Sequence, residues 1–599
     1  MTTTPPRWDL SNVYPSLESK ELESAIAESK AQLDAFEKFL TARISKVDAS
    51  TPAAELGTLL GEAVDRLNKL YELIWTIVPY IQSFVATDSR NTLAVKKMSE
   101  YQMVMVRVTT LGTKFQAWVG KLAPVLDAAI ETNQTCRDHA FNLKETAEQA
   151  RYLMSDPEES LAAELSLSGS SAWSKLQGTI TSQITVDFEL DGEVKKLPMP
   201  ALINVQQTHP DEAVRRRAYE AEIKAWDSVR EPLAACMNGV KGSTNVLNQH
   251  RGRKDALHSA IDEARIDRAT LEAMLKAMES SFPAFRKYFK TKARRFGKEK
   301  LAWWDLFAPL GSSEKQYSWE EARAFIQENF RKFSPVLEAF AKRAFDSNWI
   351  DAELREGKDG GGFCMGVAGV KESRVLCNFE GSLGDVLIIA HELGHAFHGE
   401  CAFSAGKTLL QMGTPMTLAE TASIMCETVV LEAMLAQSTN PQEELAILER
   451  RLVGDAQVIV DIYSRYLFER EIFTRRENSE LSADDLCDAM ERAQKATYGD
   501  GLDEKSLHKY MWAWKSHYYG MSFYNFPYAF GLLFGTGLYA IYQQRGPAFV
   551  DDYNNLLAST GEASAADLAA RFGIDIQSRK FWEDSLAVIT KQIDRYCEL

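Results

Sequence analysis

The sequence predicts a mainly α protein with a small β-sheet, and three observations lead to this fold class. Apolar and charged residues alternate at helical spacing over most of the chain, as between Leu22 and Leu33. Only short stretches, such as residues 183–190 and 373–379, have the alternation or β-branched content of strands. An apolar segment that carries His391 and His395 has the pattern of a buried helix. At 599 residues the chain is long enough for a large helical body with a substantial core.

Residues 17–165 predict a bundle of long helices, and the pattern then changes. Residues 166–171, which are rich in serine, predict a loop, and Asp191-Gly192 predicts a hairpin turn after the strand at 183–190. We therefore expect an N-terminal helical domain over residues 1–200 and a second domain over residues 201–599.

The segment before the histidines is expected to fold as a glycine-rich loop, a strand and then a helix. The loop is at residues 359–362 and the strand at 373–379. Ser382 and Asp385 resemble a capping box, which places the helix start near Leu383. Gly394 in the helix interior costs on the order of 1 kcal/mol relative to alanine, so another backbone is expected to pack closely there.

The helix contains the pattern His-Glu-x-x-His. Residues four apart lie one turn apart on the same face, so His391 and His395 can aim their imidazoles at one point, with Glu392 beside them. This arrangement predicts a zinc ion with an adjacent general base. The alternative is that both histidines are ordinary core residues, each satisfied by a neighbour.

A catalytic zinc site needs a third protein ligand. The metzincin pattern is excluded, because it requires glycine and histidine where this chain has His398 and Cys401. The next predicted helix, with Thr414 as N-cap, carries Glu420 and Glu427 on one mostly apolar face. We expect Glu420 to be the third ligand and Glu427 to orient a ligand histidine. Alternatively, either acid is simply solvated.

These motifs resemble the oligoendopeptidase F branch of the thimet-oligopeptidase family of zinc metallopeptidases. The resemblance rests on the sequence HELGHAFH and on an Ala-Glu-x-Ala-Ser helix with Glu420 25 positions after His395. It extends to residues 7–16 and 517–528. It implies a mainly α, two-lobed zincin-type peptidase that encloses a deep substrate channel, with one zinc ion per chain and short unstructured peptides as substrates. The strand before the zinc helix is then either a structural element or an edge that pairs with the peptide backbone.

The resemblance also implies roles for an aromatic segment near the C-terminal end. It assigns His517, Tyr524 and Tyr528 to hydrogen bonding with the substrate and its oxyanion, and leaves open which tyrosine serves the oxyanion. Aromatic clusters of this kind are otherwise usual in a hydrophobic core.

The predicted activity is therefore hydrolysis of internal peptide bonds, with Glu392 as general base. Two alternatives remain. A carboxypeptidase or dipeptidyl carboxypeptidase on a similar scaffold would need a cation for the terminal carboxylate, and a peptide-binding protein with a structural zinc would not need Glu392.

Composition limits the partners and the location. The formal net charge of −16 argues against a nucleic-acid partner, which requires clustered positive charge. The most apolar windows are shorter than the ~20 residues that span a bilayer, so no membrane association is expected. The eight scattered cysteines and the N-terminus without an apolar signal core indicate a reduced, cytoplasmic protein.

Overall fold

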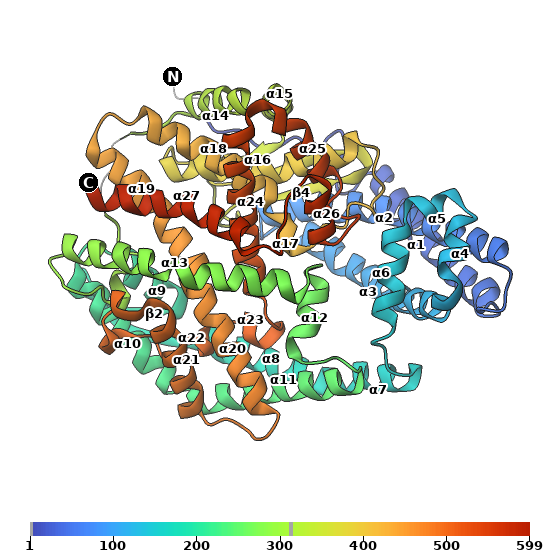
Figure 1. The fold of residues 1–599 in the computed structure, drawn as a ribbon, viewed down its shortest axis with the longest axis horizontal. Coiled ribbons are helices and arrows are strands. Elements are labelled where there is room, and N and C mark those ends of the chain that lie inside the picture. The colour runs from blue at the N-terminus through green and yellow to red at the C-terminus, as the bar shows by residue number, and fades with distance from the viewer. Residues whose placement is uncertain (1–3, 311–314) are drawn as a thin grey trace. The chain divides into compact units, whose positions relative to one another are not determined.

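The structure is a computed structural model, and it describes residues 4–310 and 315–599 (Figure 1). The mainly α prediction is confirmed, because α-helices account for most of the described chain and the strands form only two small sheets. None of the helices in the described part is long and apolar enough to cross a membrane.

The chain forms two compact units, each assembled from three separate stretches. The first unit comprises residues 1–153, 315–436 and 541–574, as far as the structure describes them. The second unit comprises residues 154–314, 437–540 and 575–599, with the same restriction. No single boundary near residue 200 separates these units, because the chain passes several times between the first unit and the second. The division into domains 1–200 and 201–599 stays a prediction.

The first unit contains an N-terminal helical bundle and a small sheet covered by further helices. The bundle core is built from apolar residues at helical spacing, among them Leu33, Phe36 and Leu60, which are at most 2% exposed. The helices of this unit are α1 (Lys20–Phe39), α2 (Ala53–Thr87), α3 (Thr92–Lys121), α4 (Leu126–Glu131), α5 (Gln134–Asp138), α6 (Ala140–Ala150), α14 (Trp319–Phe333), α15 (Pro335–Asp346), α16 (Leu383–Ser404), α17 (Met416–Ala419), most of α18 (Thr421–Gln437), α25 (Val550–Ala558) and α26 (Ala565–Arg571).

The second unit is helical apart from one β-hairpin, β1 (Thr185–Leu190) and β2 (Glu193–Pro198). The two strands pair antiparallel around Asp191 and Gly192, which both have positive φ, so the predicted hairpin turn is confirmed. The helices are α7 (Asp156–Ser168), α8 (Ser170–Gln183), α9 (Met199–Thr208), α10 (Glu212–Asp227), α11 (Arg230–His250), α12 (Ala256–Glu263), α13 (Arg268–Arg295), α19 (Pro441–Ala456), α20 (Ile462–Arg476), α21 (Ala483–Tyr498), α22 (Met511–Trp514), α23 (His517–Gly520), most of α24 (Phe526–Arg545) and α27 (Arg579–Glu598).

The predicted loop at residues 166–171 is wrong. Helix α7 continues to Ser168 and α8 begins at Ser170, so that only Gly169 interrupts the helical backbone. Tertiary packing outweighs the low helix propensity of serine here: α8 packs on α11, and the buried Gln177 donates to the carbonyl of Ala513 at 3.1 Å.

The sheet of the first unit has the order β3-β5-β4, with β3 at Ile350–Asp351, β4 at Phe363–Val367 and β5 at Glu372–Leu376. Strand β5 pairs parallel with β3 and antiparallel with β4, where Cys364 lies opposite Val375. Helix α16 packs against both β4 and β5. The small sheet beside the histidine helix is therefore confirmed, with β4 as an edge strand.

Candidate active site

Helix α16 begins where its sequence signals place it. Ser382 accepts from the backbone N–H of Asp385 at 3.2 Å, and the Asp385 carboxylate accepts from the backbone N–H of Ser382 at 3.0 Å. This reciprocal capping box confirms the predicted start at Leu383. The body of the helix is buried, because its residues are apolar on nearly all faces.

A second helix crosses α16 at Gly394, as its sequence position predicted. A Cβ atom on Gly394 would lie 2.6 Å from both the Ala422 carbonyl oxygen and Ser423 Cα, closer than side-chain atoms pack. Only glycine therefore permits this approach of α18. The crossing sets the residues around 422 directly against the turn that bears His391 and His395.

The structure brings His391, His395 and Glu420 together. One ligand atom from each lies within 4.8 Å of the others, and Glu420 Oε2 is 3.3 Å from His391 Nε2 and 3.4 Å from His395 Nε2. Each of the three side chains is 25% exposed, so the cluster is half-buried but reachable.

Glu420 does not lie inside a continuous helix, which corrects the prediction from the sequence. Helix α17 is capped by Pro415 rather than Thr414, and the backbone leaves the helix at Glu420 before α18 starts. The hydroxyls of Thr421 and Ser423 donate to the carbonyls of Leu418 and Glu420, at 2.7 and 3.1 Å, and so compete with regular helical hydrogen bonds. Ser423 also donates to Glu420 Oε2 at 2.6 Å, which fixes the carboxylate.

Glu427 lies seven residues after Glu420, about two helical turns further along the chain, and contacts the other ring nitrogen of His391. His391 donates through Nδ1 to Glu427 Oε2 at 3.0 Å. This hydrogen bond leaves Nε2 of His391 pointing to Glu420 and fixes the ring orientation, as carboxylates commonly do for metal-binding histidines.

The three residues fit a zinc ion. Zinc binds histidine nitrogen and carboxylate oxygen at ~2.0–2.2 Å, so its tetrahedral ligand atoms lie roughly 3.3–3.6 Å apart. The two nitrogen–oxygen distances of 3.3 and 3.4 Å fall in this range. Two nitrogens and one oxygen also leave a fourth position open, as a catalytic site requires.

The electrostatics of the cluster favour a cation. Burial raises the pKa of Glu420, but the hydrogen bond with His391 and the two histidine rings hold it at about 2, so this carboxylate is ionised. Burial lowers the pKa of His395, which favours the neutral imidazole that metals bind. Burial likewise lowers the pKa of His391, but hydrogen bonds to Glu420 and Glu427 outweigh it and raise the pKa to about 10. The acids therefore attract positive charge strongly at this point.

Glu392 lies beside the cluster and is 7% exposed. Its Oε2 is buried and has no hydrogen-bond partner in the described structure. Burial, together with Glu420 and Glu427, raises the pKa of Glu392 to about 7. A buried carboxylate without a partner is costly, and such groups are typical of catalytic acids and bases.

A cavity of about 430 Å³ opens onto these residues. Edge strand β4 contributes Phe363, Cys364 and Gly366 to its wall, and the histidine helix contributes Gly399 and Phe403. Gly362 is also part of this wall: a Cβ atom there would lie 3.2 Å from Glu392 Oε1 and 2.9 Å from Ile388 Cγ2.

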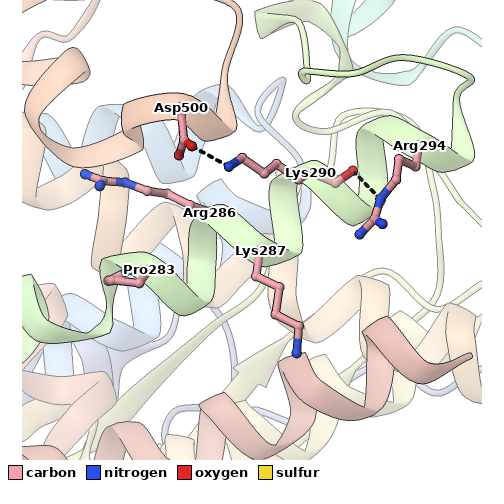
Figure 2. Close-up of a pocket in the computed structure, with 6 residues that line it drawn as sticks. All are labelled: Pro283, Arg286, Lys287, Lys290, Arg294 and Asp500. Atoms are coloured by element: carbon pink, nitrogen blue, oxygen red, sulfur yellow. Dashed lines mark hydrogen bonds and ion pairs between the residues drawn. The ribbon is translucent and has the colours of Figure 1, made fainter.

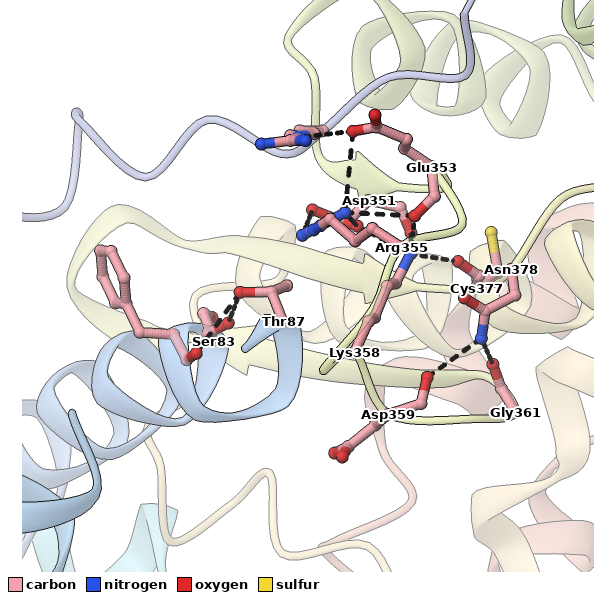
Figure 3. A network of polar contacts seen from close by, with 12 residues as sticks. Ser83, Thr87, Asp351, Glu353, Arg355, Lys358, Asp359, Gly361, Cys377 and Asn378 are labelled. Carbon is pink, nitrogen blue, oxygen red and sulfur yellow. Dashed lines mark hydrogen bonds and ion pairs between the residues drawn. The ribbon is translucent and has the colours of Figure 1, made fainter. Parts of the chain in front are cut away.

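A polar network, buried at Lys358 and Asp351 and more exposed at Asn378, holds the loop before β4 against the sheet (Figure 3). The ammonium of Lys358 pairs with Asp351 at 2.7 Å and donates to the carbonyl of Cys377 at 2.7 Å. Asn378 donates to the carbonyls of Asp359 and Gly361, at 3.0 and 3.4 Å. Asn378, which follows β5, thus holds the glycine-rich loop through the residues before and after Gly360.

His517, Tyr524 and Tyr528 lie together in the second unit. The rings of His517 and Tyr524 stack with centroids 5.4 Å apart, and Tyr528 meets Tyr524 edge-on at 5.3 Å. All three line one cavity of about 210 Å³. Tyr518 and Tyr519 are buried, and Tyr518 also contributes to the wall of this cavity.

Several residues of the first cavity were not predicted from the sequence. Gly362 falls within the predicted glycine-rich loop and was given no contact of its own, and Cys364, Ser373 and Phe403 were not singled out. Gly362 alone had a usable signal, because a glycine next to a strand often marks a close approach of another group.

Comparisons with known proteins agree with this geometry. A sequence profile described as peptidase family M3 matches residues 205–588. The chain belongs to peptidase family M3. A profile described as oligopeptidase F matches residues 123–185 of this M3 peptidase. The chain is thus a metallopeptidase with an oligopeptidase F segment in its N-terminal third.

Individual relatives of the M3 peptidase match along nearly their whole length. Group B oligopeptidase PepB of Streptococcus agalactiae is 22% identical, and the match covers 98% of this chain and 96% of PepB. An oligoendopeptidase F homolog of Lactococcus lactis is also 22% identical, over 98% of this chain and 97% of the homolog. A crystal structure of a Chlamydophila abortus protein has the same fold, with a TM-score of 0.85, 19% identity and full coverage of both chains.

Proposed function

We propose that this M3 peptidase is a zinc-dependent oligoendopeptidase that hydrolyses internal bonds of short, unstructured peptides. The observation that carries the proposal is the buried Glu392 beside the His391, His395 and Glu420 cluster. A structural zinc site does not need a carboxylate with a partnerless oxygen, whereas peptide hydrolysis needs a base at this point.

His391, His395 and Glu420 would hold the zinc ion, and Glu427 would keep the His391 ring in place. When bound, zinc supplies a water acidic enough to ionise near pH 7 and polarises the carbonyl of the scissile bond. Glu392, which lines the cavity beside the cluster, takes a proton from the attacking water and later returns it to the leaving amine.

The cavity beside Glu392 offers a way to hold an extended peptide. Strand β4 pairs only with β5 among the described strands, and residues Phe363, Cys364 and Gly366 of β4 line the cavity. Backbone pairing along such an edge recognises peptide shape with little regard for side chains. The second unit supplies His517, Tyr524 and Tyr528, which we propose hydrogen-bond the substrate, with one of the two tyrosines serving the oxyanion.

The test is mass-spectrometric product mapping on peptides of about 5 to 40 residues, with and without a chelator. We expect internal cuts that a chelator abolishes and that fade as length increases. Removal of residues from one terminus at every length would establish an exopeptidase instead. Bound zinc without any cleavage would establish a peptide-binding protein. The cytoplasmic location stays a prediction.

A further inference from the structure

The cavity of about 210 Å³ in the second unit carries more positive charge than its own acids neutralise. It is lined from α20 by Arg465 and Glu469, and from the 515–528 segment by Lys515, His517, Tyr524 and Tyr528. Because all of these residues belong to one compact unit, their mutual arrangement is defined within it.

The acids of this region are already paired. Glu469 accepts from Lys241 at 2.6 Å and from Asn525 at 2.9 Å, and this ion pair is almost completely buried. Asp461 pairs with Arg465, whose side chain is 12% exposed. Each carboxylate is therefore matched by one cation, and neither leaves a negative charge for a further one.

Lys515 is the unmatched cation. Its ammonium lies over the ring of Trp514, 3.4 Å from the centroid, and no ion pair joins it to a carboxylate of the described chain. Burial and the charge of Arg465 lower the pKa of Lys515 to about 7. Burial, Arg465 and Lys515 also lower the pKa of His517. Cationic groups thus repel one another across this cavity.

Arg465 adds an unused donor. Its Nε is buried and has no hydrogen-bond acceptor in the described structure. The preceding segment, Gln457–Asp461, is a π-helix, and its first two residues line the same cavity. Such π-helical turns are rare and frequently mark functional sites, because they are less stable than the α-helix they interrupt.

Another basic cavity of the second unit shows the contrast (Figure 2). There Lys287 pairs with Asp594 at 2.8 Å, Lys290 pairs with Asp500, and Arg286 donates to the carbonyl of Ala496 at 2.9 Å. Each of these three cations has an ion-pair or hydrogen-bond partner within the protein, whereas in the described chain the Lys515 ammonium has only the ring of Trp514.

We propose that this cavity is a carboxylate subsite, in which the Lys515 ammonium and the Arg465 Nε–H bind a carboxylate of the peptide substrate. The carboxylate is either the C-terminal one or that of an acidic side chain, since both have the same charge and geometry. A bound carboxylate removes the repulsion among the cations and satisfies the buried Nε–H. The inference rests on the proposed peptidase function and identifies a preference within it.

The test measures peptide binding by isothermal titration calorimetry in a Glu392→Gln background, so that binding is read without turnover. One nine-residue peptide is used as its free acid and as its C-terminal amide, and amidated versions carry one Glu in place of Gln at each position in turn. We expect the free acid, or one of the Glu peptides, to bind roughly tenfold more tightly than its neutral counterpart.

Three further substitutions in that background test whether Lys515 causes the preference for acidic peptides. Lys515→Gln should reduce the ratio of dissociation constants to about one, whereas Lys515→Arg should retain it. Lys505→Gln, a change at an exposed lysine of the same unit, should leave it intact. A preference for one Glu position identifies an acidic side chain as the source, and a preference for the free acid identifies the terminus.

Equal affinities for all acidic and neutral peptides would overturn the proposal, as would an unchanged ratio in Lys515→Gln. The proposed function fails separately. If the zinc-loaded wild-type enzyme cleaves none of the peptides but the ratio depends on Lys515, the carboxylate subsite stands and the peptidase assignment falls.

Discussion

The Nδ1 atom of His391 lies 3.0 Å from Glu427 Oε2, so a residue of α18 fixes the ring of a residue of α16. The same ring presents Nε2 to Glu420 at 3.3 Å. The two acids therefore hold one imidazole from both sides, and the crossing of the two helices sets its orientation.

Glu427→Gln should weaken metal binding by roughly 10- to 100-fold, because the amide is a weaker acceptor for the His391 N–H. Metal competition with a chromophoric chelator measures the affinity. Glu432→Gln, on the same helix but outside the cavity lining, is the control and should bind metal as the wild type does. Equal affinity in the two variants would show that Glu427 does not support the metal site.

Glu392→Gln should keep its metal and lose roughly 100- to 10,000-fold in kcat, since the amide cannot accept a proton. Metal content is checked by atomic emission and activity with a quenched fluorescent peptide. Glu400→Gln alters a carboxylate of the same helix that pairs with Arg343 instead, and it should stay active. A metal-loaded Glu392→Gln with full activity would remove this residue from the mechanism.

Gly362→Ala should lower kcat by up to roughly 100-fold while metal stays bound, because the new methyl group displaces the Glu392 carboxylate from its position. Gly360→Ala is the matched control, as a Cβ atom there meets nothing within 4 Å. If both variants were equally active, the contact between Gly362 and Glu392 would have no role in turnover.

Gly394→Ala should lower the free energy of unfolding by about 2 kcal/mol, because its methyl group forces the backbone of α18 away from α16. Metal affinity should fall too, since Glu420 and Glu427 flank the crossing. In Gly399→Ala, on the same helix, the nearest atom is Ser373 Oγ at 3.9 Å, so this variant should be unchanged or slightly more stable. Thermal unfolding of both variants measures the change in stability. A Gly394→Ala protein as stable as the wild type would contradict the close approach of α18 to α16 at this residue.

Acid should destabilise the metal-free protein partly through His398. Burial lowers the pKa of His398 to about 4, and Nε2 lies 2.8 Å from Thr560 Oγ1. The unfolded chain takes up a proton near pH 6.5 and the folded chain only near pH 4, so stability falls as pH drops between these values, by about 3 kcal/mol in all. His398→Gln should lose less stability between pH 7 and pH 4.5 in denaturant titrations with a chelator. An identical loss in both proteins would exclude this histidine as the cause.

Local signals predicted helix α16 well, since a capping box, an apolar helix and a glycine at a crossing are visible in the sequence of the helix itself. Glu420 was predicted to lie inside a continuous helix because serine and threonine also occur within helices, so the sequence did not reveal that the hydroxyls of Thr421 and Ser423 bind carbonyls at a break in the helix. The strand next to Gly362 could have indicated a close approach there, but not that Glu392 is the neighbour, because this contact joins two separate segments. The helical structure on both sides of Gly169 was also not predicted, because packing of α8 against α11 outweighs the low helix propensity of the serines.

The burial of α16 depends on a segment far along the chain. Helix α25 packs on α16, and Thr560 meets His398, yet residues 437–540 of the second unit are synthesised in between. During translation α16 therefore emerges from the ribosome well before α25, which packs on it. The site can be completed only after that segment is made, and until then the apolar helix α16 lacks part of its cover.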